Sequence, residues 1–167
     1  MKFHYGMKKV YFYILLVLFL ISLAINAFFV YGIFFYRVDN TFVTECGRYN
    51  KQEILINGKK IIVDVADDKC KIELGLSGTK EIKNNQGMLF VFDEIGNYGF
   101  WMKGMNYSID VLWVGDDLNI IGIEKNLNPD TYPNIFGKKY LSKYVLELPA
   151  GFSDENNIEV GNKISIL

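Results

Sequence analysis

The chain has 167 residues, of which 50% are apolar and 22% are charged, and its formal net charge at pH 7 is −1. These values exclude a large multidomain enzyme, a disordered chain, a basic nucleic-acid-binding protein and a domain held by many disulfides. The charge is unevenly distributed, with +3 before residue 10, none over residues 10–36 and −4 over residues 37–167. The sequence therefore divides into an apolar N-terminal segment and a polar, acidic remainder.

Residues 10–36 form an uncharged run of 27 residues that predicts a transmembrane helix. At 1.5 Å per residue the run reaches about 40 Å, which is enough to cross roughly 30 Å of hydrocarbon with some tilt. Lys2, Lys8 and Lys9 precede it, so the positive-inside rule places the tail of residues 1–9 in the cytoplasm and the C-terminal domain outside. We expect an uncleaved signal anchor that holds a single-pass protein in the lipid bilayer.

A cleaved signal peptide is the alternative interpretation of this segment. Ser22, Leu23 and Ala24 offer a small-residue cleavage site. Strongly apolar sequence continues for twelve more residues, however, and cleavage would leave an apolar new N-terminus. The uncleaved anchor is therefore favoured.

The chain contains two cysteines, Cys46 and Cys70, and one histidine, His4. The cysteines could pair in an oxidising exterior, but we expect two unpaired thiols because Cys46 lies in a predicted linker. These residues provide no metal-ligand spacing, so we expect no metal and no cofactor. A single histidine in the N-terminal tail also excludes Ser-His-Asp and Cys-His catalysis in the predicted outer domain.

Residues 37–52 are polar, mixed and without periodicity, which predicts a stalk. A globular domain is expected over residues 53–167. It begins with a β-hairpin, because Asn57 and Gly58 separate two apolar runs and tolerate the positive φ angles of a tight turn.

The rest of the domain is a series of short apolar segments separated by turn residues. We expect a short helix capped by Asp67 or Asp68, strands at 88–92, 98–102, 107–114, 118–124, 144–148 and 163–167, a turn at 93–97, a loop at 126–139 and a helical turn at 153–157. Short connections favour antiparallel pairs, since a parallel connection needs a dozen or more residues. The pattern predicts one β-rich α+β domain with mostly antiparallel strands, as a barrel or a sandwich.

Several strings in this domain carry a resemblance to one protein family. They are GMLFVFDE from Gly87, FWMK from Phe100, the residues around Asp110, and YVLELPAG from Tyr144. In order and spacing they resemble the family named domain of unknown function 192, over residues 54–167. The resemblance implies a compact, barrel-like, β-rich domain with small helices, found alone or behind signal and anchor segments. It implies no established activity.

The sequence departs from the family pattern after the FWMK string. The family's usual Asn-Thr is Gly104-Met105 here, and its Pro-Leu-Asp is Ser108-Ile109-Asp110. Lys103 and Asp110 are therefore the charged residues that remain in this neighbourhood.

Trp101, Lys103, Asp110 and Glu147 are the candidate ligand-binding residues. Trp101 and Lys103 are two residues apart on a predicted strand, so their side chains share one face. A cation beside an indole, with Asp110 on the next strand, suits a polar or sugar-like ligand. A structural role is the alternative and is favoured, because aromatic residues in strands are chiefly core residues. Lys103 would then be solvated, and Asp110 would cap a turn or pair with Lys103.

Glu147 lies in an apolar strand, on the same side as Val145. If that side is buried, Glu147 needs a partner, such as Lys103 or a backbone donor. Asp93, Asp110 and Glu147 are also the candidate carboxylates for glycoside cleavage, which requires a facing acid and base.

We therefore predict a membrane-anchored extracytoplasmic module that binds a polar small molecule, a carbohydrate or an envelope protein, and no nucleic acid. Under this hypothesis the protein is not expected to be an enzyme. The hypothesis requires an exposed Trp101 beside an unpaired Lys103. The alternative is a cell-envelope hydrolase that acts on carbohydrate or another polar polymer through two convergent carboxylates. A third possibility is a structural role in which the anchor pairs with a partner helix.

Overall fold

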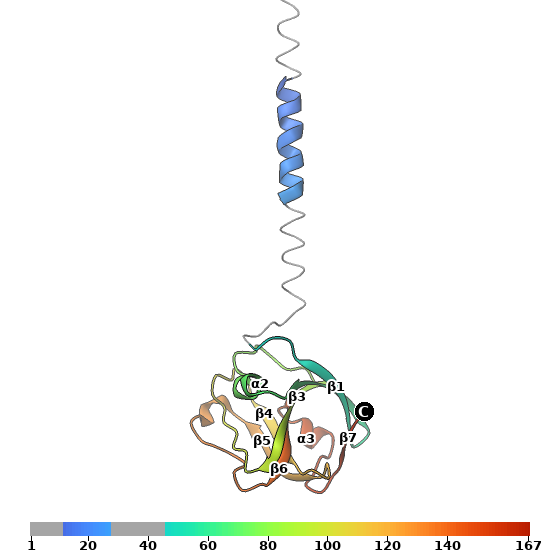
Figure 1. The fold of residues 1–167 in the computed structure, drawn as a ribbon, viewed down its shortest axis with the longest axis vertical. Coiled ribbons are helices and arrows are strands. Elements are labelled where there is room, and N and C mark those ends of the chain that lie inside the picture. Colours follow the sequence, from blue (N-terminus) through green and yellow to red (C-terminus); the bar gives the residue numbers. More distant parts are fainter. Residues whose placement is uncertain (1–11, 28–45) are drawn as a thin grey trace, which may run out of the picture. The chain divides into compact units, whose positions relative to one another are not determined.

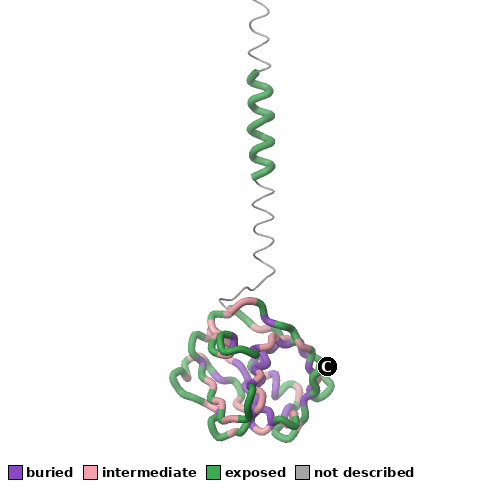
Figure 2. The backbone as a smooth tube through the Cα atoms, viewed as in Figure 1, coloured by how far each residue is buried: buried purple, intermediate pink, exposed green. Residues whose placement is uncertain are grey.

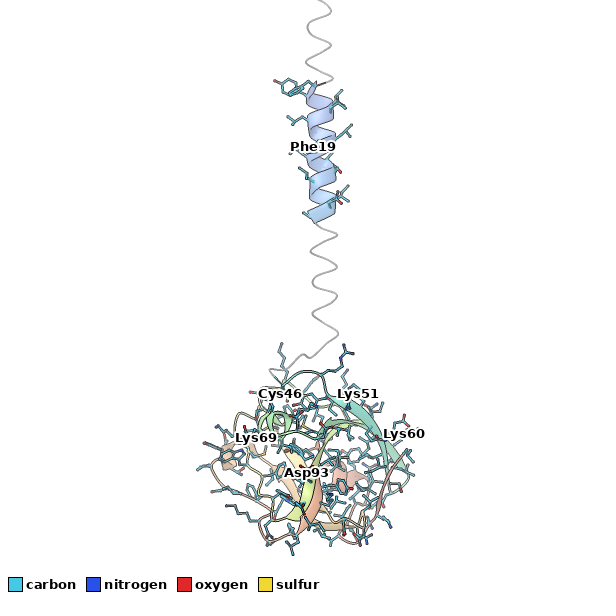
Figure 3. The ribbon with its side chains drawn as sticks, viewed as in Figure 1. Phe19, Cys46, Lys51, Lys60, Lys69 and Asp93 are labelled. Carbon is cyan, nitrogen blue, oxygen red and sulfur yellow. The ribbon has the colours of Figure 1, made fainter. Side chains whose placement is uncertain are left out.

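The computed structural model describes residues 12–27 and 46–167. The chain divides into two compact units, Met1–Arg48 and Tyr49–Leu167. In the first unit, residues 12–27 form an α-helix, drawn in blue in Figure 1. Its apolar side chains, such as that of Phe19, are exposed along the whole described helix (Figures 2 and 3).

The predicted membrane segment at residues 10–36 extends beyond this helix at both ends. Residues 10, 11 and 28–36 lie outside the described residues, as do the predicted cytoplasmic tail and residues 37–45 of the predicted stalk. Within 12–27 and 46–167, no helix combines the length and the apolar character needed to cross a membrane.

The second unit is built from seven strands and three short helical elements. In chain order they are β1 (Asn50–Ile56), β2 (Lys59–Ala66), α2 (Lys69–Leu74), β3 (Gln86–Gly96), β4 (Ile109–Val114), β5 (Ile120–Leu127), the 3-10 helix η1 (Pro129–Thr131), β6 (Ser142–Pro149), α3 (Phe152–Glu155) and β7 (Ile164–Ile166).

These strands form one sheet in the order β5-β4-β6-β3-β2-β1-β7. All neighbouring pairs are antiparallel except β2 and β3, which are parallel and joined through α2. The two edges of the sheet approach each other, because Asn119 and Lys163 form a bridge and the Ile164 amide donates to the Leu118 carbonyl at 3.0 Å. The sheet is therefore curved into a half-barrel (Figure 1). The β-rich, mostly antiparallel prediction is confirmed.

The first elements form where the sequence predicts them. Asn57 and Gly58 take positive φ angles of 45° and 78° between paired strands β1 and β2, as the tight turn requires. Asp68 is the N-cap of α2, and its Oδ1 accepts a hydrogen bond from the Lys71 amide at 2.9 Å. Gly75 ends that helix.

Each face of the sheet carries its own apolar core. The inner face collects residues from strands at both ends of the sheet order, among them Ile120 of β5 and Ile164 of β7, so it is the inside of the curved sheet. The outer face carries a second cluster that includes Met88, Val111 and Trp113. Both faces are therefore covered at the centre of the sheet, where every residue of β4 and most residues of β6 are buried, and buried segments run through the domain in Figure 2.

Two local predictions are wrong. Residues 98–102 do not form a strand, because Phe100 pairs only with Phe136 as an isolated bridge to a loop. The turn predicted at 93–97 is also wrong, because residues 93–96 belong to β3. This strand continues to Gly96 with a register shift against β6.

The expectation for the cysteines is wrong as well. Cys46 and Cys70 are both disulfide-bonded. The expectation failed because it treated Cys46 as part of a free stalk, whereas only three residues separate it from the first strand of the sheet.

Candidate binding site

Trp101 and Lys103 lie together on the surface of the domain. The Lys103 Nζ is 5.4 Å from the centroid of the Trp101 ring, within the range of a cation–π contact. Trp101 is 48% exposed, and Tyr132, 46% exposed, meets it edge to face with 5.8 Å between ring centroids. Among the described residues, no ion pair involves Lys103. The surface thus presents two aromatic rings and one unpaired cation.

This surface is held by the segment beneath it. Phe100 and Phe136 exchange two backbone hydrogen bonds, of 3.0 Å and 2.8 Å, which fix the Trp101 segment to the loop that carries Tyr132. Phe100 packs edge to face on Phe90, and Met102 is 2% exposed. Because alternate residues point inward, Trp101 and Lys103 share the outward side even though the segment is not a strand.

Tyr132 is the residue of this surface that the sequence did not reveal. It follows η1, whose N-cap Asn128 accepts a hydrogen bond from the Asp130 amide at 2.9 Å. The pair of prolines around Tyr132 marks a loop, but no sequence signal places that loop beside Trp101.

Asp110 is fully buried and has a structural role. Its Oδ1 accepts from the amides of Asn126 at 2.9 Å and Gly151 at 3.1 Å, and its Oδ2 accepts from the Ser153 amide at 2.8 Å. Two of these donors belong to the first turn of α3 or directly precede it. A carboxylate there satisfies amides that the helix leaves unpaired. Asp110 therefore joins β4 to β5 and to the start of α3.

Glu147 is also buried, 5% exposed, but its Oε2 has no hydrogen-bond partner within the described part of the chain. It lies opposite Met88 of β3 and Val111 of β4 on the outer face. Burial in this apolar environment raises the pKa of Glu147 to about 8. The predicted partners, Lys103 or a backbone donor, are not found.

Two loops, residues 75–79 and 103–107, cross each other against the outer-face cluster that contains Met88 and Val111, the residues opposite Glu147. The Ser77 hydroxyl donates to the Lys103 carbonyl at 2.8 Å, and the Gly78 amide donates to the Gly104 carbonyl at 2.8 Å. The Thr79 and Tyr107 hydroxyls are 2.6 Å apart. Tyr107 packs against this outer-face cluster. Burial raises the pKa of Tyr107, the hydrogen bond with Thr79 lowers it, and the charge of Glu147 raises it.

The four candidate binding residues therefore do not line one site. Trp101 and Lys103 lie together, whereas Asp110 and Glu147 are buried on opposite faces of the sheet. Asp93, labelled in Figure 3, lies at an exposed position of β3. Its carbonyl accepts a hydrogen bond from Lys143 Nζ at 2.6 Å. In residues 12–27 and 46–167, no three His, Cys, Asp or Glu side chains are grouped as metal ligands.

Comparison with known proteins places the domain in a family. The model of the family named domain of unknown function 192, described as an uncharacterised ACR, matches residues 52–166. The chain belongs to this family, which confirms the resemblance seen in its motifs. Comparison with curated protein sequences gives no match.

Two crystal structures share the fold. One is a protein from Sinorhizobium meliloti 1021, provisionally assigned as a transcription regulator; it is 28% identical, with a TM-score of 0.67 over 71% of this chain and 95% of that chain. The other is a protein of unknown function from Novosphingobium aromaticivorans DSM 12444, 21% identical, with a TM-score of 0.60 over 71% of this chain and 85% of that chain.

Proposed function

We propose that the domain binds a carbohydrate that carries an anionic group, through Trp101, Tyr132 and Lys103. The observation that carries this proposal is the exposed Trp101 ring with the unpaired Lys103 ammonium 5.4 Å from its centroid. An exposed indole offers a flat apolar face on which the C–H groups of a sugar ring stack. The neighbouring ammonium supplies a charge-assisted hydrogen bond to a carboxylate or phosphate.

The contacts of these side chains support binding rather than packing. Trp101 and Tyr132 are each about half exposed and touch each other, so they form a small aromatic patch on the surface. The backbone bonds between Phe100 and Phe136 hold the patch in place. A held aromatic patch loses little conformational entropy when a ligand binds.

The hydrolase alternative has no such support. Asp110 and Glu147 face opposite sides of the sheet, and Asp110 is occupied by three backbone amides. A nucleic-acid ligand is not proposed either, because residues 37–167 carry a net charge of −4 and nucleic-acid binding depends on basic surfaces.

We also propose that residues 10–36 anchor the chain in a membrane, with residues 1–9 in the cytoplasm and the domain outside. The uncharged run, the preceding lysines and the exposed apolar side chains of residues 12–27 support this proposal. The disulfide-bonded state of both cysteines is typical of an oxidising exterior. Protease added to intact cells should remove the domain; protection that persists after any outer barrier is opened would contradict the proposed orientation.

Calorimetric titration of the full-length chain with a galacturonic acid oligomer, and with a neutral glucose oligomer of equal length, tests the binding proposal. The acidic oligomer should bind more tightly. Trp101→Ala should weaken its binding about fivefold or more, since stacking on one ring contributes about 1 kcal/mol or more. Lys103→Gln should remove the preference for the acidic oligomer. The control Lys59→Gln should change neither the affinity for the acidic oligomer nor this preference. Binding that is unchanged in Trp101→Ala, or absent for both oligomers, would overturn the proposal.

A further inference from the structure

Glu147 is a buried ionisable residue that the proposed binding surface does not use. Its Oε2 lies in the protein interior without a hydrogen-bond partner among the described residues. Isolated buried carboxylates are unfavourable because water can no longer solvate the charge. The carboxyl group is therefore stable in this position only in its neutral, protonated form.

The groups that face Glu147 provide no compensating charge. Met88 of β3 and Val111 of β4 lie directly opposite Glu147, and Val145 and Pro149 are its same-side neighbours on β6. Tyr107, in the loop before β4, packs against the same outer-face cluster and is bonded to Thr79. Tyr107 is the one titratable side chain in this set. Burial alone raises the pKa of Glu147, and the nearby Asp110 lies on the other face of the sheet.

The crossing loops connect this buried group to the proposed binding surface. Loop 103–107 carries Tyr107 at one end and Lys103 at the other. Lys103 is held through its carbonyl by the Ser77 hydroxyl, and the Gly78 amide is held by the Gly104 carbonyl. The Asn106 side chain adds a third bond, to the Thr79 carbonyl at 2.8 Å. A change at Tyr107 therefore reaches Lys103 through one short loop.

We propose that loops 75–79 and 103–107 form a latch that is closed while Glu147 is protonated and that opens when Glu147 loses its proton. The step transfers one proton from the Glu147 carboxyl group to solvent. The remaining carboxylate requires water. It becomes hydrated when the hydrogen bonds between loops 75–79 and 103–107 break and Tyr107 moves away from the sheet. Opening releases Lys103 from Ser77 and so disrupts the Trp101–Lys103 surface. The regulatory consequence rests on the proposed binding function, whereas the latch itself does not.

Hydrogen exchange of the Gly78 amide in the full-length chain tests the latch. Since the pKa of Glu147 is about 8 in the closed state and 4.5 when hydrated, the opening constant should rise about tenfold between pH 7 and pH 9. Glu147→Gln should show no such rise after the same correction for intrinsic exchange. The control Glu94→Gln, at an exposed position of β3, should behave as the wild type. Equal pH dependence in the wild type and Glu147→Gln would overturn the latch.

Iodide quenching of tryptophan fluorescence gives a second measurement. It uses the wild-type chain alone, so it does not depend on whether a variant folds. Trp113 is fully buried, so the quenchable emission belongs to Trp101. Its accessibility should change between pH 7 and pH 9, and a constant accessibility would contradict the coupling. If hydrogen exchange shows that the latch opens but Trp101→Ala still binds the sugar, the proposed binding surface is refuted and the latch is supported. Binding that needs Trp101 but does not change with pH would refute the regulation alone.

Discussion

Asp110 on β4 and Glu147 on β6 lie at diagonal positions of adjacent strands, yet their carboxyl groups lie on opposite faces of the sheet. Asp110 is directly opposite Leu148, and Glu147 is directly opposite Val111. Directly opposed residues point to the same side, and consecutive residues point to opposite sides. The inner carboxylate accepts three backbone hydrogen bonds, whereas the outer carboxyl group has an unpartnered oxygen. Replacing each carboxyl group with an amide should therefore have opposite effects on the stability of the domain.

Asp110→Asn should destabilise the domain by about 2–4 kcal/mol. An amide NH₂ in place of one carboxylate oxygen would face a backbone N–H, so at least one of the three buried bonds is lost. The midpoint of urea unfolding measures the change, and the exposed Asp93→Asn serves as the control, with an expected change of about 0.5 kcal/mol or less. A variant as stable as the wild type would contradict the structural role of Asp110.

Glu147→Gln should stabilise the domain increasingly as the pH rises. The pKa of Glu147 is raised in the folded state from its usual 4.5 to about 8, so the folded chain keeps a proton that the unfolded chain releases between these values. The contribution of Glu147 to folding stability is therefore fully present below about pH 4.5 and is lost as the pH rises through 8. Urea unfolding at pH 5, 7 and 9 should show a growing advantage of Glu147→Gln, on the order of a few kcal/mol. A difference that is constant with pH would argue against a neutral Glu147.

Gly137→Ala should destabilise the domain more than Gly58→Ala. Both glycines have positive φ angles, 81° and 78°, but an added Cβ at Gly137 would lie 1.9 Å from the Trp113 ring, whereas Gly58 faces open space. We expect about 1–2 kcal/mol at Gly58 from the backbone alone, and about 1–3 kcal/mol more at Gly137 from displacement of the ring. Unfolding midpoints measure both, and near-ultraviolet circular dichroism should report the displaced Trp113 only in Gly137→Ala. Equal losses of stability in the two variants would show that displacing the Trp113 ring costs no free energy.

Local features of the fold could be predicted from the sequence because their causes are local. The Asn57-Gly58 turn, the Asp68 cap and the run of short apolar strands follow from backbone preferences and spacing. Residues 98–102 look like a strand by the same rules, but their partner is Phe136 in a distant loop. No periodicity of the segment itself reveals that pairing.

The candidate site could be predicted only in part. The exposed pair Trp101 and Lys103 was found because the alternation of side chains survives without a strand. Tyr132 was missed, since its position beside Trp101 depends on a long-range contact. The role of Asp110 depends on amides that lie 16 to 43 residues further along the chain. The sequence predicts that Glu147 shares a side with Val145, but not that this side is buried and offers no partner.

The state of the cysteines gives a simple chemical prediction. Because Cys46 and Cys70 are disulfide-bonded, the denatured, unreduced full-length chain should not react with a maleimide reagent. After reduction it should take up two equivalents, one for each cysteine of the chain. Mass spectrometry measures both values. Reaction at either cysteine before reduction would contradict the bonded state.

The two indole N–H signals in an NMR titration test whether Trp101 contacts a carbohydrate ligand. Trp113 Nε1 donates to the Tyr98 carbonyl at 2.8 Å and is buried, so its signal is an internal control. On addition of the galacturonic acid oligomer, the Trp101 indole signal should move in a saturable way while the Trp113 signal stays in place. A Trp101 signal that remains fixed at saturating oligomer would show that the ligand does not bind at Trp101.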